Sequence, residues 1–153
     1  MTSPFVTHRD KVLGYYSTAS WLRKLVLAMW NGTDYKVGLS SLASMDDEHY
    51  AAALAMIQSY RQHGERDPTF MVLAEACQQR AEAEEAASRR NARFESWCQE
   101  VQFDLRRASQ RASYIEDHYA WFEQQFDAGA EPAVAAARAL ESNLDGRATT
   151  RTD

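Results

Sequence analysis

The feature that most constrains the fold is a run of 60 residues, Thr69 to Ala128, that contains neither glycine nor proline. Both residue types interrupt helices, and the run is rich in the helix formers Ala, Glu, Gln and Arg. It therefore predicts either one long helix or two helices, of roughly 68–90 and 92–127. The alternation of apolar and polar residues that is typical of strands does not occur in the sequence, so we expect an all-α fold.

Within this run, apolar or small residues recur at alternating spacings of three and four, which is a heptad pattern typical of coiled coils. Arg80, Glu84 and Asn91 interrupt the pattern, so we expect that part to be exposed or the helix to bend there. The later part needs a partner surface, either the N-terminal helices folding back or a second copy. The positions predicted for this core or dimer seam are Phe94, Val101, Leu105, Ile115, Tyr119, Phe122 and Phe126.

A second aromatic stripe accompanies the seam and consists of Phe103, Tyr114 and Trp121. In a helix, Phe103 would lie about 200° from Val101, on the opposite side. Aromatic residues on two opposite faces indicate that both faces are packed. Either both lie in one intramolecular core, or this stripe is an interface with a second copy or another protein.

Shorter helices flank the long run. We expect one from Ser17–Thr18 to Trp30 and one from Asp46 to Gly64, with Asp46 as its N-terminal cap. The second is predicted to bury Tyr50, Ala53, Leu54, Ile57 and Tyr60, and a last helix from Pro132 places Val134, Ala137, Leu140 and Leu144 on one face. The predicted organisation is a helical N-terminal bundle (1–77), a long coiled-coil-like helical arm, continuous or bent (78–127), a short C-terminal helix (128–146) and a disordered tail (147–153).

The formal net charge is −5, and the excess acid lies in residues 112–153, which hold 3 basic and 8 acidic residues. Glu116, Glu123 and Asp127 are spaced seven and four apart and would share one helix face, with Asp117 and Glu131 close by. Such an acidic face fits a basic protein or ribonucleoprotein partner. The alternative is a solvated face that keeps the protein soluble.

The charge distribution also bears on nucleic acid and membranes. Direct nucleic-acid binding needs a basic surface, and a helix-turn-helix reader is disfavoured because its recognition helix would open with Asp46, Asp47 and Glu48. No apolar run of about 18 residues is present, and the start of the sequence lacks the apolar segment of a signal peptide. We expect a cytoplasmic protein without a membrane span.

The sequence offers no recognisable catalytic or metal-binding motif. Its histidines, His8, His49, His63 and His118, lack the spacing of zinc ligands, and the pair Asp46 and His49 has no evident third ligand. Cys77 and Cys98 would lie about 31 Å apart on one continuous helix, so they could pair only across a dimer or if the helix breaks. We expect both to be packed thiols. We therefore expect no catalytic site, metal or cofactor, and a protein that is not an enzyme.

Residues 21–76 resemble a small uncharacterised domain encoded on bacterial integrative and conjugative elements. The resemblance lies in Leu27-Ala28-Met29-Trp30-Asn31, then Leu39-Ser40-Ser41-Leu42 and Met45-Asp46, then the helix through Ile57. It covers about a third of the chain and implies no functional residues. In size, charge and helical character, the whole chain is similar to anti-CRISPR proteins that act on type I-F surveillance complexes.

The anti-CRISPR resemblance implies a non-enzymatic inhibitor that binds the surveillance complex and blocks target DNA binding or nuclease recruitment. It would act as a homodimer through the seam. The alternative is an accessory interaction protein of a mobile genetic element, within a transfer or maintenance assembly. A third hypothesis is a small enzyme with a site around His49, His63 or His118.

Overall fold

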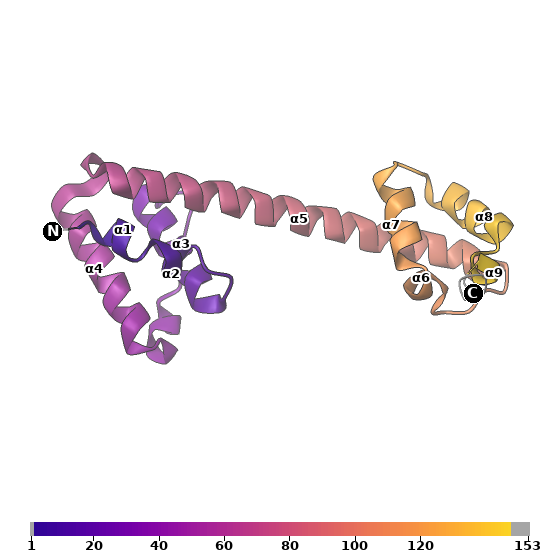
Figure 1. The fold of residues 1–153 in the computed structure, drawn as a ribbon, viewed down its shortest axis with the longest axis horizontal. Helices are drawn as coiled ribbons and strands as arrows, with labels where there is room; N and C mark the ends of the chain where they lie inside the picture. The colour runs from indigo at the N-terminus through magenta and orange to yellow at the C-terminus, as the bar shows by residue number, and fades with distance from the viewer. Residues whose placement is uncertain (1, 148–153) are drawn as a thin grey trace, which may run out of the picture. The chain divides into compact units, whose positions relative to one another are not determined.

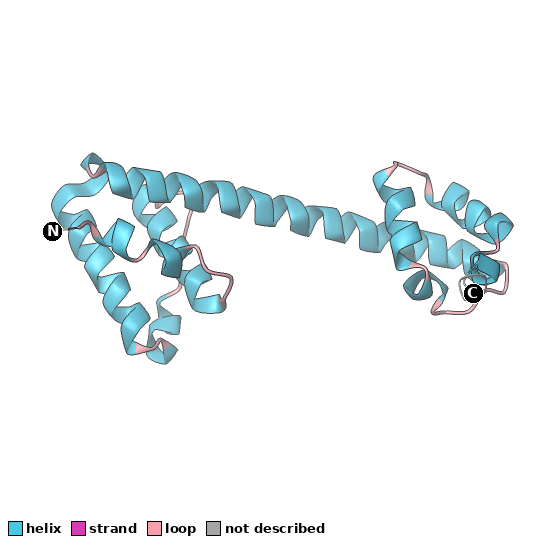
Figure 2. Ribbon diagram, viewed as in Figure 1, coloured by secondary structure: helices cyan, strands magenta, loops and turns pink. Residues whose placement is uncertain are grey.

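The computed structural model describes residues 2–147, in which every regular element is a helix (Figures 1 and 2), so the predicted all-α class is confirmed. The helices are α1 (Pro4–Thr7), α2 (Arg9–Val12), α3 (Ser17–Trp30), α4 (Asp47–His63), α5 (Pro68–Arg107), α6 (Tyr114–Asp117), α7 (Tyr119–Asp127), α8 (Pro132–Ser142) and α9 (Leu144–Arg147), with 3₁₀ turns at Leu39–Ser44 and Gly64–Arg66.

The chain divides into two compact units, Met1–Glu84 (unit 1) and Glu85–Asp153 (unit 2), and each has its own hydrophobic core. This differs from the predicted division into 1–77, 78–127 and 128–146, because the end of α5 and the C-terminal helices share one core. Of the predicted tail, 147–153, Arg147 ends α9 and the other residues lie outside the described part.

Helix α3 supplies much of the core of unit 1. It is apolar over a wide arc, and Leu22 and Val26 are fully buried. Phe70 of α5 completes this core, with its ring centroid 5.0 Å from that of Phe5 and 4.8 Å from that of Tyr60. Burial of such side chains, at about 25 cal/mol per Å² of apolar surface, is the main source of stability for the unit.

Arg23 is a buried cation on α3, with 7 % of its surface exposed. Its guanidinium donates hydrogen bonds to the carbonyl oxygens of Val12 (3.3 Å) and Gly14 (2.8 Å) and pairs with Glu84 at 3.2 Å. Arg80 donates to the carbonyl of Leu13 and also pairs with Glu84. Arg80 and Glu84, which interrupt the heptad pattern, therefore hold the segment between α2 and α3 against α5.

Helix α4 begins as predicted, with the Asp46 carboxylate accepting a hydrogen bond from the His49 amide at 3.0 Å. The prediction of which α4 residues are buried is wrong in part. The helix buries Ala52, Ala53 and Met56 and leaves the larger predicted residues Tyr50, Leu54 and Ile57 exposed. Small alanines allow a close approach of helix backbones, so the buried face here is not the face with the largest side chains.

Helix α5 begins at Pro68, as the Asp-Pro pair predicts, with the Asp67 carboxylate accepting a hydrogen bond from the Thr69 amide at 2.8 Å. The Thr69 hydroxyl donates to the same carboxylate, and the Ser3 hydroxyl donates to its other oxygen. Burial alone would raise the pKa of Asp67, but these hydrogen bonds outweigh burial and lower it. The carboxylate therefore links the start of α1 to the start of α5.

We expect Asp67→Ala to lower the free energy of unfolding by about 1 kcal/mol at pH 7, the usual cost of losing a helix cap. A carboxyl whose pKa is lower in the folded chain than its unfolded value of about 3.9 stabilises above that value, and the contribution is lost as the pH falls through the folded pKa. The difference in the free energy of unfolding between variant and parent, measured by urea unfolding, should therefore be smaller at pH 3 than at pH 7. Glu75→Ala, an exposed change on the same helix, is the control, and an equal loss at both pH values would contradict the assignment.

Helix α5 ends at Arg107, so the predicted continuation to about residue 127 is wrong. Ser109 has a left-handed backbone with φ 62°. Its amide donates to the carbonyl of Arg106 (2.9 Å), and the amide of Gln110 donates to that of Leu105 (3.0 Å). This pair of bonds around a left-handed residue is the Schellman helix end, here formed without glycine.

Unit 2 folds the predicted seam into its own core. Phe94, Val101, Leu105, Ile115 and Phe122 are buried together with Trp97 and Tyr114 of unit 2. The seam residues of α5 pack against the group α6–α9, which is neither of the two predicted partners. Phe126 is half-buried against this core, whereas Tyr119 is half-exposed and does not belong to it.

Helix α8 also presents a different face from the predicted one. Ala135, Ala136 and Ala139 are buried, while Val134 and Leu140 are exposed. The Trp97 indole donates to the carbonyl of Ala130 at 2.8 Å, which fixes the segment before the helix. Leu144, expected at the end of the same helix, is buried as the first residue of α9.

None of the helices in the described residues combines the length and the apolar character that a crossing of the bilayer requires.

Candidate functional site

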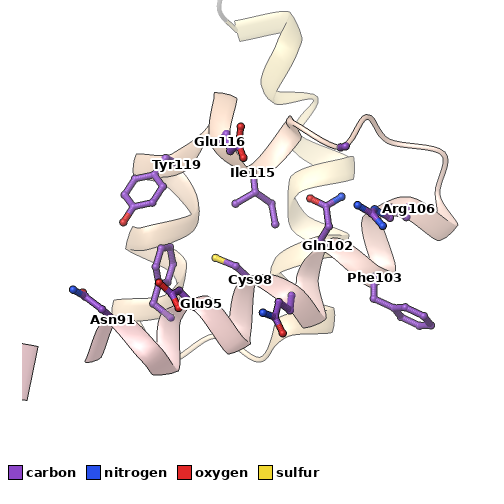
Figure 3. Close-up of a pocket in the computed structure, with 12 residues that line it drawn as sticks. Asn91, Glu95, Cys98, Gln102, Phe103, Arg106, Ile115, Glu116 and Tyr119 are labelled. Atoms are coloured by element: carbon purple, nitrogen blue, oxygen red, sulfur yellow. The ribbon is translucent and has the colours of Figure 1, made fainter. Parts of the chain in front are cut away.

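Unit 2 carries a groove of about 750 Å³ between the second half of α5 and the α6–α7 segment (Figure 3). Helix α5 contributes Asn91, Phe94, Glu95, Cys98, Gln99, Gln102, Phe103 and Arg106, and the chain after the turn contributes Ala112, Ile115, Glu116 and Tyr119. The Schellman end of α5 makes the groove, because it turns the chain back and brings α6 and α7 alongside α5. Asn91, the third residue that interrupts the heptad pattern, lies at one end.

The floor of the groove is apolar and uncharged. Phe94 of α5 and Ile115 of α6 are buried, and Cys98 lies half-buried on α5, four residues after Phe94, with its sulfur directed into the space between α5 and the facing segment in Figure 3. Burial, with a smaller contribution from Glu95, raises the pKa of Cys98 to about 11. At neutral pH this side chain is therefore a protonated thiol, which behaves as a small apolar group rather than as a nucleophile.

The rim of the groove is polar. Glu95 on α5 and Glu116 on α6 are both exposed, and neither forms an ion pair with a cation in the described part of the chain. The Gln102 amide nitrogen is buried in the groove wall and has no hydrogen-bond partner among residues 2–147. A buried donor without a partner costs about 1–3 kcal/mol.

The predicted acidic face does not exist as one free surface. Glu123 and Asp127 of α7 pair with Arg90 of α5, at 3.2 and 2.7 Å, and Asp117 pairs with Arg111 at 2.8 Å. The hydrogen bond from Arg111 lowers the pKa of Asp117. Three of the five predicted carboxylates are thus engaged within unit 2. Of the others, Glu116 lies on the groove and Glu131 is exposed beside α8.

The predicted aromatic interface is also divided. Tyr114 is 1 % exposed, and its hydroxyl donates to the carbonyl of Ala139, so it is a core residue. Trp121 is half-buried against Phe122, with ring centroids 4.9 Å apart. Phe103 alone is available for a partner, at 65 % exposure on the edge of the groove. Together with Tyr119, half-exposed on the α7 side, it gives the groove accessible aromatic surface.

Two histidines take part in hydrogen-bonded clusters. His49 lies between Asp46, 2.8 Å from Nδ1, and the hydroxyl of Tyr16, 2.9 Å from Nε2. The hydrogen bond with His49 lowers the pKa of Asp46. His118 Nε2 lies 2.9 Å from Asp145, which Arg111 also binds. Both clusters tie neighbouring segments together, and no group of three or more potential metal ligands occurs in the described residues.

Sequence reasoning identified Glu116, Phe103 and Tyr119 as candidates, but it did not bring them into one site. Glu95, Cys98 and Gln102 were missed as groove residues. Their spacings of three and four from Glu95 through Cys98 to Gln102 place them on one face of α5, and this signal was available. The facing residues could not be identified, because the position of the turn after α5 was unknown.

Comparison with known proteins gives one match. It covers residues 12–89, which is about half of the chain and most of unit 1, and it stops before the groove. No curated protein and no solved structure matches the chain. The matching family is described as a family of unknown function, DUF7673, and the chain belongs to it.

Proposed function

We propose that the protein is a non-enzymatic binding protein whose groove in unit 2 receives a segment of a partner protein. That segment carries an apolar side chain flanked by Lys or Arg. The observation that supports this proposal is the combination of an apolar floor, Phe94, Cys98 and Ile115, with the unpaired rim carboxylates of Glu95 and Glu116.

Each part of the groove has a role in this proposal. Its volume of about 750 Å³ falls within the range of roughly 300–1,000 Å³ of ligand sites, and an apolar side chain on the floor gains about 25 cal/mol per Å² buried. The rim carboxylates would select a basic segment and orient it.

The narrower proposal is that the partner belongs to a type I-F CRISPR surveillance complex and that the protein is an anti-CRISPR inhibitor. Its support is the similarity of size, acidity and helical character to such inhibitors. The test is retention of the complex by the immobilised protein, with and without target duplex bound first. Retention that disappears with bound duplex means competition for the DNA path, and retention in both cases means a block of a later step. No retention contradicts the narrower proposal.

We expect the double charge reversal Glu95→Lys/Glu116→Lys to weaken binding of a retained partner at least tenfold, equivalent to about 1.4 kcal/mol. Titration by surface plasmon resonance measures the loss. Glu141→Lys, an exposed reversal on α8 outside the groove, is the matched control. Reversal at Glu123 or Asp127 would be a poor test, because it breaks ion pairs with Arg90 inside unit 2. A loss of binding free energy per reversed charge that is equal in the control and the double variant would mean that only overall charge matters.

The alternative is an accessory protein of a mobile genetic element that uses the same groove. Its support is the resemblance of residues 21–76 to a domain of integrative and conjugative elements. Expression in cells that carry an active type I-F system separates the two proposals. An inhibitor protects a targeted phage or plasmid, whereas the accessory protein gives no protection.

A further inference from the structure

Helix α4 has an exposed face that is centred on Leu54. Taking 100° per residue, seven positions fall within about 60° of Leu54 around the helix. All seven are exposed, and they are Asp47, Tyr50, Ala51, Leu54, Ile57, Gln58 and Arg61. The three large apolar residues are 40–42 % exposed, although the periodicity of the sequence would bury them. No other element of unit 1 covers this face.

The two ends of the face carry opposite charges. Asp47 and Arg61 each lie seven residues from Leu54, one before it and one after it. Neither forms an ion pair within the described part of the chain. Between them, Ala51 and Ile57 lie three residues from the centre, and Tyr50 and Gln58 lie four residues from it. Because its two ends carry opposite charges, the face is complementary to itself in charge when one copy is turned end over end.

We propose that α4 pairs with α4 of a second copy of this chain, antiparallel and related by a two-fold axis at Leu54. Asp47 of each copy then faces Arg61 of the other, and Tyr50 and Ile57 cover the central leucines. A parallel pair would place Asp47 beside Asp47 and Arg61 beside Arg61, which is unfavourable. A two-fold pair uses the same patch on both copies and closes without forming a filament.

The size of the contact indicates a weak dimer. Helix α4 has 17 residues and is about 25 Å long, so a pair of such helices falls at the low end of the range of specific interfaces. We therefore expect dissociation constants on the order of micromolar or weaker. The inference does not depend on the proposed function, because the groove lies in unit 2 and α4 lies wholly in unit 1.

The two-fold axis makes a sharp test possible, because a residue on the axis lies next to the same residue of the second copy. Packed helices lie about 8–10 Å apart, and subtracting two Cα radii of about 2.3 Å leaves about 3.4–5.4 Å between the Cα atoms at residue 54. The upper part of this range fits a disulfide. Residue 58 would lie about 12 Å from its own copy, eight residues along the paired axes, which is too far.

We expect Leu54→Cys to form a covalent dimer under mild oxidation of the full chain, and Gln58→Cys to remain largely monomeric on a non-reducing gel. The parent chain controls for Cys77 and Cys98, whose pKa values burial raises to about 12 and about 11, so that both remain thiols. Equal cross-linking of the two variants would mean random collision. No cross-linking of Leu54→Cys at high protein concentration would also overturn the proposal.

The charges supply a second test that needs no cysteine. Asp47→Arg alone places two arginines together at each end of the pair and should weaken the dimer at least tenfold in sedimentation equilibrium. Asp47→Arg/Arg61→Asp reverses both ends and should restore dimerisation. Thermal unfolding of the same samples checks that each variant is folded. A double variant as weak as the single one, while still folded, would contradict the antiparallel pairing.

Discussion

Leu105→Asp is expected to unfold unit 2 while unit 1 remains folded. Leu105 is fully buried in the core of unit 2, where a carboxylate would have no partner. Burying an unpaired charge costs more than about 4 kcal/mol, a large part of the stability of a small domain. Hydrogen exchange measured by mass spectrometry should show loss of protection after about residue 90, with protection retained in α3 and α4.

Phe103→Asp is the matched control for this prediction. It introduces the same carboxylate on the same helix, two residues earlier, at a side chain that is 65 % exposed. We expect it to change the free energy of unfolding by less than about 1 kcal/mol. Uniform loss of protection in Leu105→Asp would show that the two units unfold together. Equal damage by both substitutions would mean that Leu105 is not a core residue.

Arg23→Ala is expected to destabilise unit 1 by about 3 kcal/mol. It removes the donor from the carbonyl oxygens of Val12 and Gly14, and each buried acceptor left without a partner costs about 1–3 kcal/mol. It also removes the cation that Glu84 faces. Urea unfolding should show a lower midpoint, and hydrogen exchange should be fastest between α2 and α3, the segment that Arg23 holds.

Lys24→Ala, an exposed cation beside Arg23 on α3, is the control and should be nearly neutral. Arg23→Met keeps much of the side-chain volume without the donors, so it separates packing from hydrogen bonding. If Arg23→Met were as stable as the parent, the hydrogen bonds of the guanidinium would not be what holds the segment.

The local signals in the sequence predicted the starts of the main helices. Asp46 before α4 and Asp67-Pro68 before α5 specify helix starts through a carboxylate that caps neighbouring amides, and such signals do not depend on tertiary structure. The end of α5 could not be predicted in this way. Ser109 takes a left-handed backbone that is more typical of glycine, and nothing in its residue type indicates this.

The buried faces of α4 and α8 were predicted less well than the helices themselves. Periodicity favours the larger side chains Leu54, Ile57 and Leu140, but the structure buries alanines at both places. Which face is buried depends on how closely another helix approaches, and that is decided by tertiary packing. The same limit applies to the predicted acidic face. Arg90 pairs with Glu123 and Asp127, which are distant from it in sequence, and Arg111 pairs with Asp117 across a turn.

The family match and the two proposed surfaces fall on different parts of the chain. Residues 12–89 include all of α4 but none of the groove, whose lining begins at Asn91. The family match therefore covers the proposed dimer face and does not cover the groove. The two surfaces are best tested separately, with variants confined to one unit at a time.

The left-handed serine at the end of α5 also bears on how the sequence can change. An L-residue with a side chain pays about 1 kcal/mol more than glycine for this backbone conformation, so Ser109→Gly would keep the turn and strengthen it. A single substitution at this exposed position, outside the core, would therefore stabilise unit 2. Where substitutions in the groove weaken the unit, suppressor mutations should arise at Ser109.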